Sequence, residues 1–144
     1  MPHLVILYSA NLDARTDMSA LCRKLADAML ARRDETGKAV FPPGGTRVLA
    51  YPAPHFAISD GGAAGRAVGG SGNYGFAYLN LRMGRGRSEA VHQGVGQALS
   101  AVAKAHFQPL LADMHVGVTL QIDVGAEVFD AKHSSLHPLF NKPG

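Results

Sequence analysis

The sequence contains a single cysteine, Cys22, among its 144 residues. One cysteine cannot form a disulfide within the chain, and its place in a helical pattern is typical of a small core residue in a protein from a reducing compartment. The N-terminus lacks the basic and apolar regions of a signal peptide, and no apolar run reaches the roughly 18 residues of a membrane span. The sequence therefore predicts a cytoplasmic protein without a membrane anchor.

Several catalytic signatures are also absent. The histidines have no metal-ligand spacing such as H-E-x-x-H, and a second cysteine for a thiolate site is missing. Neither a phosphate-binding P-loop with its lysine nor a G-x-S-x-G nucleophile motif occurs. The sequence therefore predicts no metal and no nucleotide cofactor. The histidines are His3, His55, His92, His106, His115, His133 and His137.

The composition is that of one ordinary globular domain. At 15.1 kDa the chain is long enough to bury a single core, and 47% of its residues are hydrophobic while 17% are charged. The net charge of +3 suits anionic ligands but is small for a nucleic-acid-binding protein. We therefore treat residues 1–144 as one domain, and the charge alone does not identify a partner.

The first half of the chain has the pattern strand, helix, strand. Residues 4–8 form a short, continuous apolar run, which predicts a strand buried on both faces. Residues 13–33 predict a helix, because their apolar residues recur at spacings of three and four. Residues 46–58 resemble a strand in which Pro52 and Pro54 favour an edge position. The apolar face of the helix consists of Met18, Leu21, Cys22, Leu25 and Met29.

The second half repeats this pattern after a glycine-rich segment. Residues 61–75 contain seven glycines and predict a flexible loop. Residues 74–83 and 115–124 alternate with the period of a strand, and Ser88 is suited to cap the helix between them. The apolar face of that helix consists of Val91, Val95, Ala98, Leu99, Val102 and Leu110.

Together these patterns predict an α+β fold of two β-α-β units, at about 2–58 and 74–125. A glycine-rich loop at about 59–73 joins the units, and a tail follows at 126–144. Because β-α-β crossovers are right-handed, both helices are expected on one face of a four-stranded sheet. The opposite face is partly apolar, and oligomerisation would cover it.

Pro2 directly follows the initiator methionine, and two interpretations of it are open. Proline is harmless at the first position of a strand, since no ladder hydrogen bond is needed there. Alternatively, removal of Met1 leaves Pro2 as a free secondary amine. An α-amino group titrates near ~8, and an apolar pocket or nearby cations lower that pKa towards the range in which a general base works best.

The arginine-rich segment RMGRGRS at residues 82–88 has three possible interpretations. It is suited to bind a carboxylate, because guanidinium groups bind carboxylates bidentately and the N-terminus of a helix follows. It is also compatible with a solvated basic turn, because basic turns are common, or with a contact to nucleic acid. Arg47, after the turn FPPGG, is a surface charge or a second anion-binding residue.

Five segments of the sequence, taken in order, resemble one known family. These segments are MPH, FPPGGTR, FAYLNLRMGRGRS, AHFQPLL and LHPLF, and they are spread over nearly the whole chain. They resemble the 5-carboxymethyl-2-hydroxymuconate isomerases of the N-terminal-proline tautomerase superfamily. The glycine-rich segment 61–72 is longer than the family pattern, and Arg85 stands where that pattern has a small residue.

The resemblance implies a homotrimer without metal or organic cofactor that converts a dienol carrying several carboxylates into a conjugated ketone. The family's proton-shuttling proline falls on Pro2, and its two active-site arginines fall on Arg47 and Arg87. We expect Arg85 and Lys132 to help bind the substrate, with Arg82 and His133 as weaker candidates. The alternative is a non-catalytic binding protein that retains the tautomerase scaffold.

Overall fold

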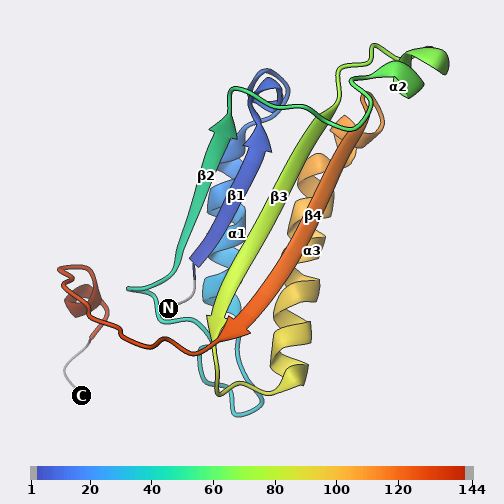
Figure 1. The fold of residues 1–144 in the computed structure, drawn as a ribbon. Helices are drawn as coiled ribbons and strands as arrows, with labels where there is room; N and C mark the ends of the chain where they lie inside the picture. Colours follow the sequence, from blue (N-terminus) through green and yellow to red (C-terminus); the bar gives the residue numbers. More distant parts are fainter. Residues whose placement is uncertain (1–2, 142–144) are drawn as a thin grey trace.

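The computed structural model describes residues 3–141 and contains one four-stranded sheet (Figure 1). The strand order is β2-β1-β3-β4, in which β1 pairs parallel with β2 and antiparallel with β3, and β3 pairs parallel with β4. The strands are β1 at His3–Ser9, β2 at Arg47–Ala53, β3 at Gly75–Gly84 and β4 at Val116–Gly125.

Two long helices lie on the same face of this sheet (Figure 1). Helix α1 (Met18–Ala31) connects β1 to β2 and packs on β2, while α3 (Glu89–Leu111) connects β3 to β4 and packs on β4. The two helices also contact each other. This arrangement confirms the expected α+β fold, with two parallel strand pairs joined by helical crossovers.

Side chains at the helix N-termini fix where each helix begins. The Asp17 carboxylate accepts a hydrogen bond from the Ala20 N–H at 3.0 Å, so α1 starts at Met18 and not at residue 13. The preceding residues instead form a short 3-10 helix, η1 (Ala10–Ala14). At α3 the Ser88 hydroxyl accepts from the Val91 N–H at 3.2 Å, which confirms the expected cap.

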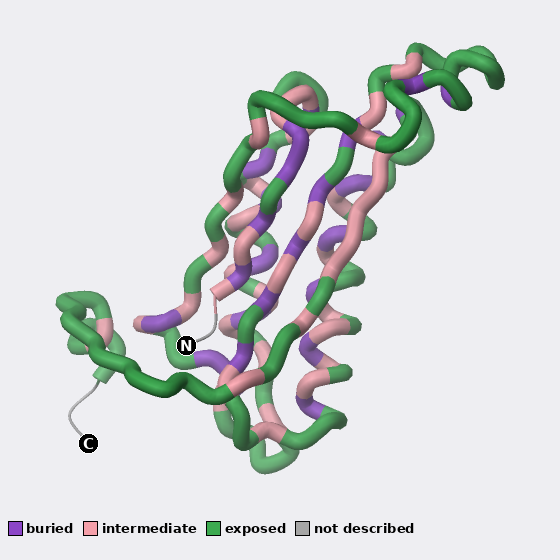
Figure 2. Tube along the Cα trace, in the orientation of Figure 1, coloured by how far each residue is buried: buried purple, intermediate pink, exposed green. Residues whose placement is uncertain are grey.

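The core lies between the sheet and the helices (Figure 2). Alternate residues of β3 are buried, as the strand period predicts. The apolar faces of both helices are largely confirmed, although Cys22, Ala98 and Val102 are only partly buried. The helices bury Met18, Leu21, Leu25, Met29, Val91, Val95, Leu99, Ala103, Phe107 and Leu110.

The opposite face of the sheet is open, which corrects the expectation that β1 is buried on both faces. Leu7 is 52% exposed, and its neighbours on β2, Leu49 and Tyr51, are 43% and 50% exposed. Leu4, Ile6 and Tyr8, which alternate along β1, face the helices and are buried, and Ser9 at the end of the strand is buried as well. The continuous apolar run therefore serves two environments, the core on one side and an uncovered apolar surface on the other.

The glycine-rich segment is not entirely a loop, because it contains a short helix, α2 (Ala63–Ala67). The Asp60 carboxylate explains this correction, since it accepts hydrogen bonds from the N–H groups of Gly62 at 3.0 Å and Ala64 at 2.9 Å. Tyr74 Oη also accepts from the Gly65 N–H at 2.9 Å. These bonds satisfy donors in the first turn, which glycine content alone does not reveal.

Beyond β4, residues 126–141 run past the end of the sheet where β1 and β2 begin (Figure 1). This tail contains a single 3-10 turn, η2 (His137–Leu139), and several of its apolar side chains are exposed. Strand β2 ends at Ala53, earlier than the expected residue 58, and it lies at the sheet edge as its proline predicts. Within residues 3–141, no helix is long and apolar enough to cross a membrane.

Candidate active site

Three basic side chains lie in a row at the end of the sheet where β1 begins. His3 on β1 is directly opposite Arg47 on β2 and Arg82 on β3. Their strand neighbours Leu4 and Leu81 are buried against the helices, so the three basic residues lie on the open face. Pro2 precedes this row in the sequence but lies outside the described residues.

The Arg47 guanidinium is fixed by two contacts. Its Nη1 donates to the Gly45 carbonyl at 3.2 Å, and its Nη2 lies 3.1 Å from His3 Nδ1. Because a guanidinium can only donate, Nδ1 of neutral His3 accepts and the ring proton resides on Nε2. Burial, followed by the charge of Arg47, holds the pKa of His3 below its usual value of 6.5.

Arg87 lies in the short connection between β3 and α3. Its side chain forms hydrogen bonds with the loop that follows α1. Its Nη1 donates to Asp34 Oδ2 at 3.3 Å, and its Nη2 donates to the Val40 carbonyl at 2.9 Å. The side chain is 31% exposed and that of Asp34 is 13% exposed. Arg87 is therefore a held side chain and not a mobile surface charge.

A cavity of about 250 Å³ brings three of the expected substrate-binding residues together. Arg85, Arg87 and Lys132 line it, so the arginine-rich turn and the C-terminal tail meet there. The remaining walls are largely apolar and come from Met83 and the segment 40–42. Lys132 also forms an ion pair with Asp130. Such a cavity presents two guanidinium groups and one ammonium group to a small anion.

Arg47 lines a different cavity, of about 550 Å³, between α1, the start of β2 and the tail residues Leu136 and Phe140. The structure thus brings Arg47 and Arg87 to one end of the sheet without placing them in a common pocket. Arg82 on β3 lies beside His3, and the Arg82 guanidinium also lies close to Gly125 at the end of β4. His133 is an exposed residue of the tail and lines neither cavity.

Sequence reasoning missed the loop that holds Arg87. Asp34 Oδ1 accepts from the Thr36 N–H, the Thr36 hydroxyl and the Lys38 N–H at 2.9, 2.6 and 3.0 Å. Gly37 adopts a φ of 84°, which a glycine adopts without strain. The letters D-E-T-G are a recognisable turn signal, but nothing in them reveals a partner 53 residues away.

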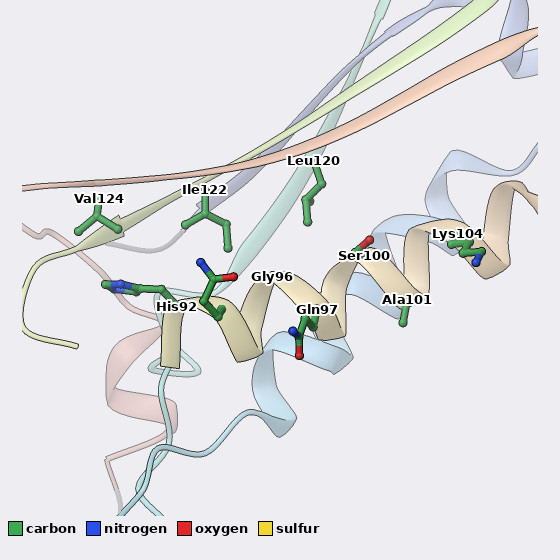
Figure 3. A pocket seen from close by; sticks show the side chains of 10 residues that line it. His92, Gly96, Gln97, Ser100, Ala101, Lys104, Leu120, Ile122 and Val124 are labelled. Carbon is green, nitrogen blue, oxygen red and sulfur yellow. The ribbon is translucent and has the colours of Figure 1, made fainter. Parts of the chain in front are cut away.

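Further cavities lie elsewhere in the described part of the chain. One of about 710 Å³ lies between α3 and β4, where Leu120, Ile122 and Val124 face Gly96 and Ser100 (Figure 3). Another of about 640 Å³ lies at the opposite end of the sheet, beside α2. None of the basic residues expected at the active site lines either cavity. Within residues 3–141, no cluster of three or more His, Cys, Asp or Glu side chains is arranged to hold a metal ion.

The lowered pKa of His3 gives a pH-dependent prediction. Since the folded state favours the neutral ring, the unfolded chain binds the proton more readily below pH 6.5. His3 should therefore contribute fully to stability above pH 6.5, and that contribution should fall as the pH drops from 6.5 through the folded pKa. An NMR titration of His3 should have its midpoint below 6.5.

The variant Arg47→Ala tests the cause of this shift. It should raise the midpoint of His3 while leaving it below 6.5, because burial is the larger effect. A midpoint at or above 6.5 in the unmodified chain would contradict the described environment. An unchanged midpoint in Arg47→Ala would contradict the contact between the two side chains.

A family model, a curated protein and solved structures that resemble this chain all bear the name of one enzyme family. The model of the family described as 5-carboxymethyl-2-hydroxymuconate isomerase matches residues 2–140. A curated 5-carboxymethyl-2-hydroxymuconate Delta-isomerase from Escherichia coli is 25% identical over 140 residues, which are 97% of this chain and 99% of that protein.

Two solved structures extend this similarity to the fold. The crystal structure of a 5-carboxymethyl-2-hydroxymuconate delta-isomerase is 66% identical and has a TM-score of 0.96, covering 100% of this chain and 95% of the other. A 5-carboxymethyl-2-hydroxymuconate isomerase from Deinococcus radiodurans R1 is 30% identical with a TM-score of 0.78, covering 98% and 95%. The expected family is confirmed, and the chain belongs to the 5-carboxymethyl-2-hydroxymuconate isomerases.

Proposed function

We propose that the chain is a cytoplasmic isomerase that converts 5-carboxymethyl-2-hydroxymuconate, a dienol with three carboxylates, into its conjugated ketone during the breakdown of aromatic compounds. The observation that carries the proposal is the cavity lined by Arg85, Arg87 and Lys132 in a chain of this family. Three cations around a small cavity suit a substrate with several carboxylates. Members with the same activity in their names include the 66% identical solved structure.

The reaction moves one proton and needs no change of oxidation state. The enol O–H bond breaks, its electron pair forms the carbonyl, the double bonds shift, and a C–H bond forms at the far end of the diene. In the proposed mechanism the neutral amine of Pro2, freed by removal of Met1, accepts the first proton and returns one to carbon. Arg47 and Arg87 bind carboxylates and stabilise the oxyanion that develops during the transfer.

The position of Pro2 in the chain supports this role for its amine. Pro2 immediately precedes His3, which lies between Arg47 and Arg82 at the start of β1. Cations near an amine disfavour its protonated form and lower its pKa from ~8 towards neutrality. A general base with a pKa near the working pH contributes most to the rate.

Substitution of the three residues should reduce turnover in distinguishable ways. Pro2→Ala should fold normally and lose turnover sharply, by about 10²-fold or more, because a positioned general base contributes about that much. Arg47→Ala and Arg87→Ala should each lower kcat and raise KM, since both charges act on the ground state and on the developing oxyanion. Steady-state kinetics of enol-to-ketone conversion measure these effects.

Arg15→Ala is the matched control, because Arg15 pairs with Asp113 at the opposite end of the sheet. It removes one positive charge and should leave kcat and KM unchanged. Undiminished turnover in Pro2→Ala would overturn the proposed base. Tight binding of the tricarboxylate by a chain that converts no enol would favour a binding protein on this scaffold instead.

We further propose that the active form is a homotrimer, as the family resemblance implies. The exposed side chains of Leu7, Leu49 and Tyr51 support this proposal, because a lone chain of this size rarely leaves such an apolar sheet face uncovered. The proposal also requires that the open face, which carries Arg47, lies near a neighbouring subunit.

Sedimentation equilibrium should give three times the chain mass of 15.1 kDa. Leu7→Glu should shift the mass towards that of one chain, because a carboxylate on the apolar face cannot be buried without a large desolvation cost. The control Ala105→Glu adds the same charge at an exposed position of α3 and should leave the mass unchanged. A single-chain mass for the unmodified protein would contradict the trimer.

A further inference from the structure

We propose that Asp34 is a positioning residue that holds the Arg87 guanidinium in the orientation needed at the substrate cavity. The inference rests on the proposed function for its catalytic consequence, but the contact itself is a property of the described structure. Asp34 Oδ2 accepts from Arg87 Nη1, and the Val40 carbonyl accepts from Arg87 Nη2. Bonds to both terminal nitrogens fix the plane of the guanidinium, while its other N–H groups remain for an anion.

Asp34 is itself held rigidly, so that it can impose this orientation. Three hydrogen bonds from Thr36 and Lys38 fix Oδ1, and the Asp34 N–H donates to the Lys38 carbonyl at 2.8 Å. The Asp34 carboxylate thus links two segments of the chain, because Oδ1 closes its own turn and Oδ2 accepts from Arg87. A rigid acceptor costs less entropy to keep in place than a flexible one.

The ionised form of Asp34 is maintained at neutral pH. The Thr36 hydroxyl bond, the backbone bonds from Lys38 and Thr36, and the charge of Arg87 together hold the pKa of this carboxyl below its ordinary value, although burial acts in the opposite direction. The pair is also partly shielded from water, with 13% of the Asp34 side chain exposed. Arg87 therefore has a permanent counter-charge in Asp34, which does not itself line the cavity.

The hydrogen bond from Arg87 to the Val40 carbonyl explains why a small displacement of the guanidinium would affect the reaction rate. Val40 and Phe41 are buried in the core, and both also line the cavity that Arg87 enters. The cavity wall and the guanidinium are consequently held by the same loop. Movement of that loop changes both together, and misplacement of a charged group by about 1 Å can cost up to about 10²-fold in rate.

The test compares Asp34→Asn and Arg87→Ala, singly and together. In Asp34→Asn, an amide oxygen directed towards Thr36 and Lys38 keeps the turn and places an N–H donor opposite Arg87, so only the pair is disrupted. Asp34→Asn alone should lower kcat/KM about 10-fold or more. In the Arg87→Ala background it should cause no further loss, because a positioning residue has nothing left to position.

Glu35→Gln is the control from the same loop. Glu35 accepts from the Ser88 hydroxyl at 2.8 Å and not from Arg87. The substitution Glu35→Gln therefore removes one negative charge, as Asp34→Asn does, but leaves the ion pair between Asp34 and Arg87 intact. Its kcat/KM should stay within about two-fold of the unmodified chain. Unchanged turnover in Asp34→Asn, or an equal loss with and without Arg87, would overturn the proposal.

A second measurement keeps this test independent of the reaction. Side-chain ¹⁵N NMR should show restricted rotation of the Arg87 guanidinium in the unmodified chain and in Glu35→Gln, and freer rotation in Asp34→Asn. Identical rotation in all three would overturn the role of Asp34. If the unmodified chain converts no enol while Asp34→Asn releases Arg87, the proposed function fails and the positioning contact stands.

Discussion

The antiparallel pairing of β1 with β3 is the constraint on which the candidate site depends. Each of these strands has a parallel partner outside it, so the starts of β1 and β2 and the end of β3 meet at one end of the sheet. That end collects Arg47, Arg82 and His3 on the open face. The connection from β3 to α3 starts there too and adds Arg85 and Arg87. The pairing of β1 with β2 and β3 thus brings together cationic side chains from distant parts of the sequence.

Two turns outside the sheet orient the Arg47 and Arg87 side chains through hydrogen bonds. The loop after α1 holds Arg87 through Asp34 and Val40, while the turn before β2 holds Arg47 through Gly45. Both turns follow the same helix, and both lie beside the C-terminal tail, which contributes Lys132 to one cavity and Leu136 to the other. The two arginines line separate cavities in the single chain, so a common substrate would have to span both or meet them in an assembled protein.

Local patterns predicted what depends on neighbours in the sequence. The alternation in residues 74–83 gave the buried face of β3, and Ser88 gave the start of α3. The contact between Asp34 and Arg87 escaped prediction because it joins distant residues. Helix α2 escaped it because the glycine content of the segment hides the hydrogen bonds that Asp60 and Tyr74 accept there. Leu7 was misassigned because an apolar side chain looks the same in the sequence whether it packs in the core or lies on the open face of the sheet. The family, by contrast, was recognisable from five short segments, and the roles of Pro2, Arg47 and Arg87 stay predictions.

The most direct test of the account combines two measurements on one untagged sample: the intact mass, and the turnover of 5-carboxymethyl-2-hydroxymuconate beside a simpler enol acid. The account predicts a mass that lacks Met1, so that the proline amine is free, and much faster conversion of the tricarboxylate. A chain without Met1 that converts neither compound would contradict the central claim. Full activity in a chain that retains Met1 would contradict the role of the Pro2 amine.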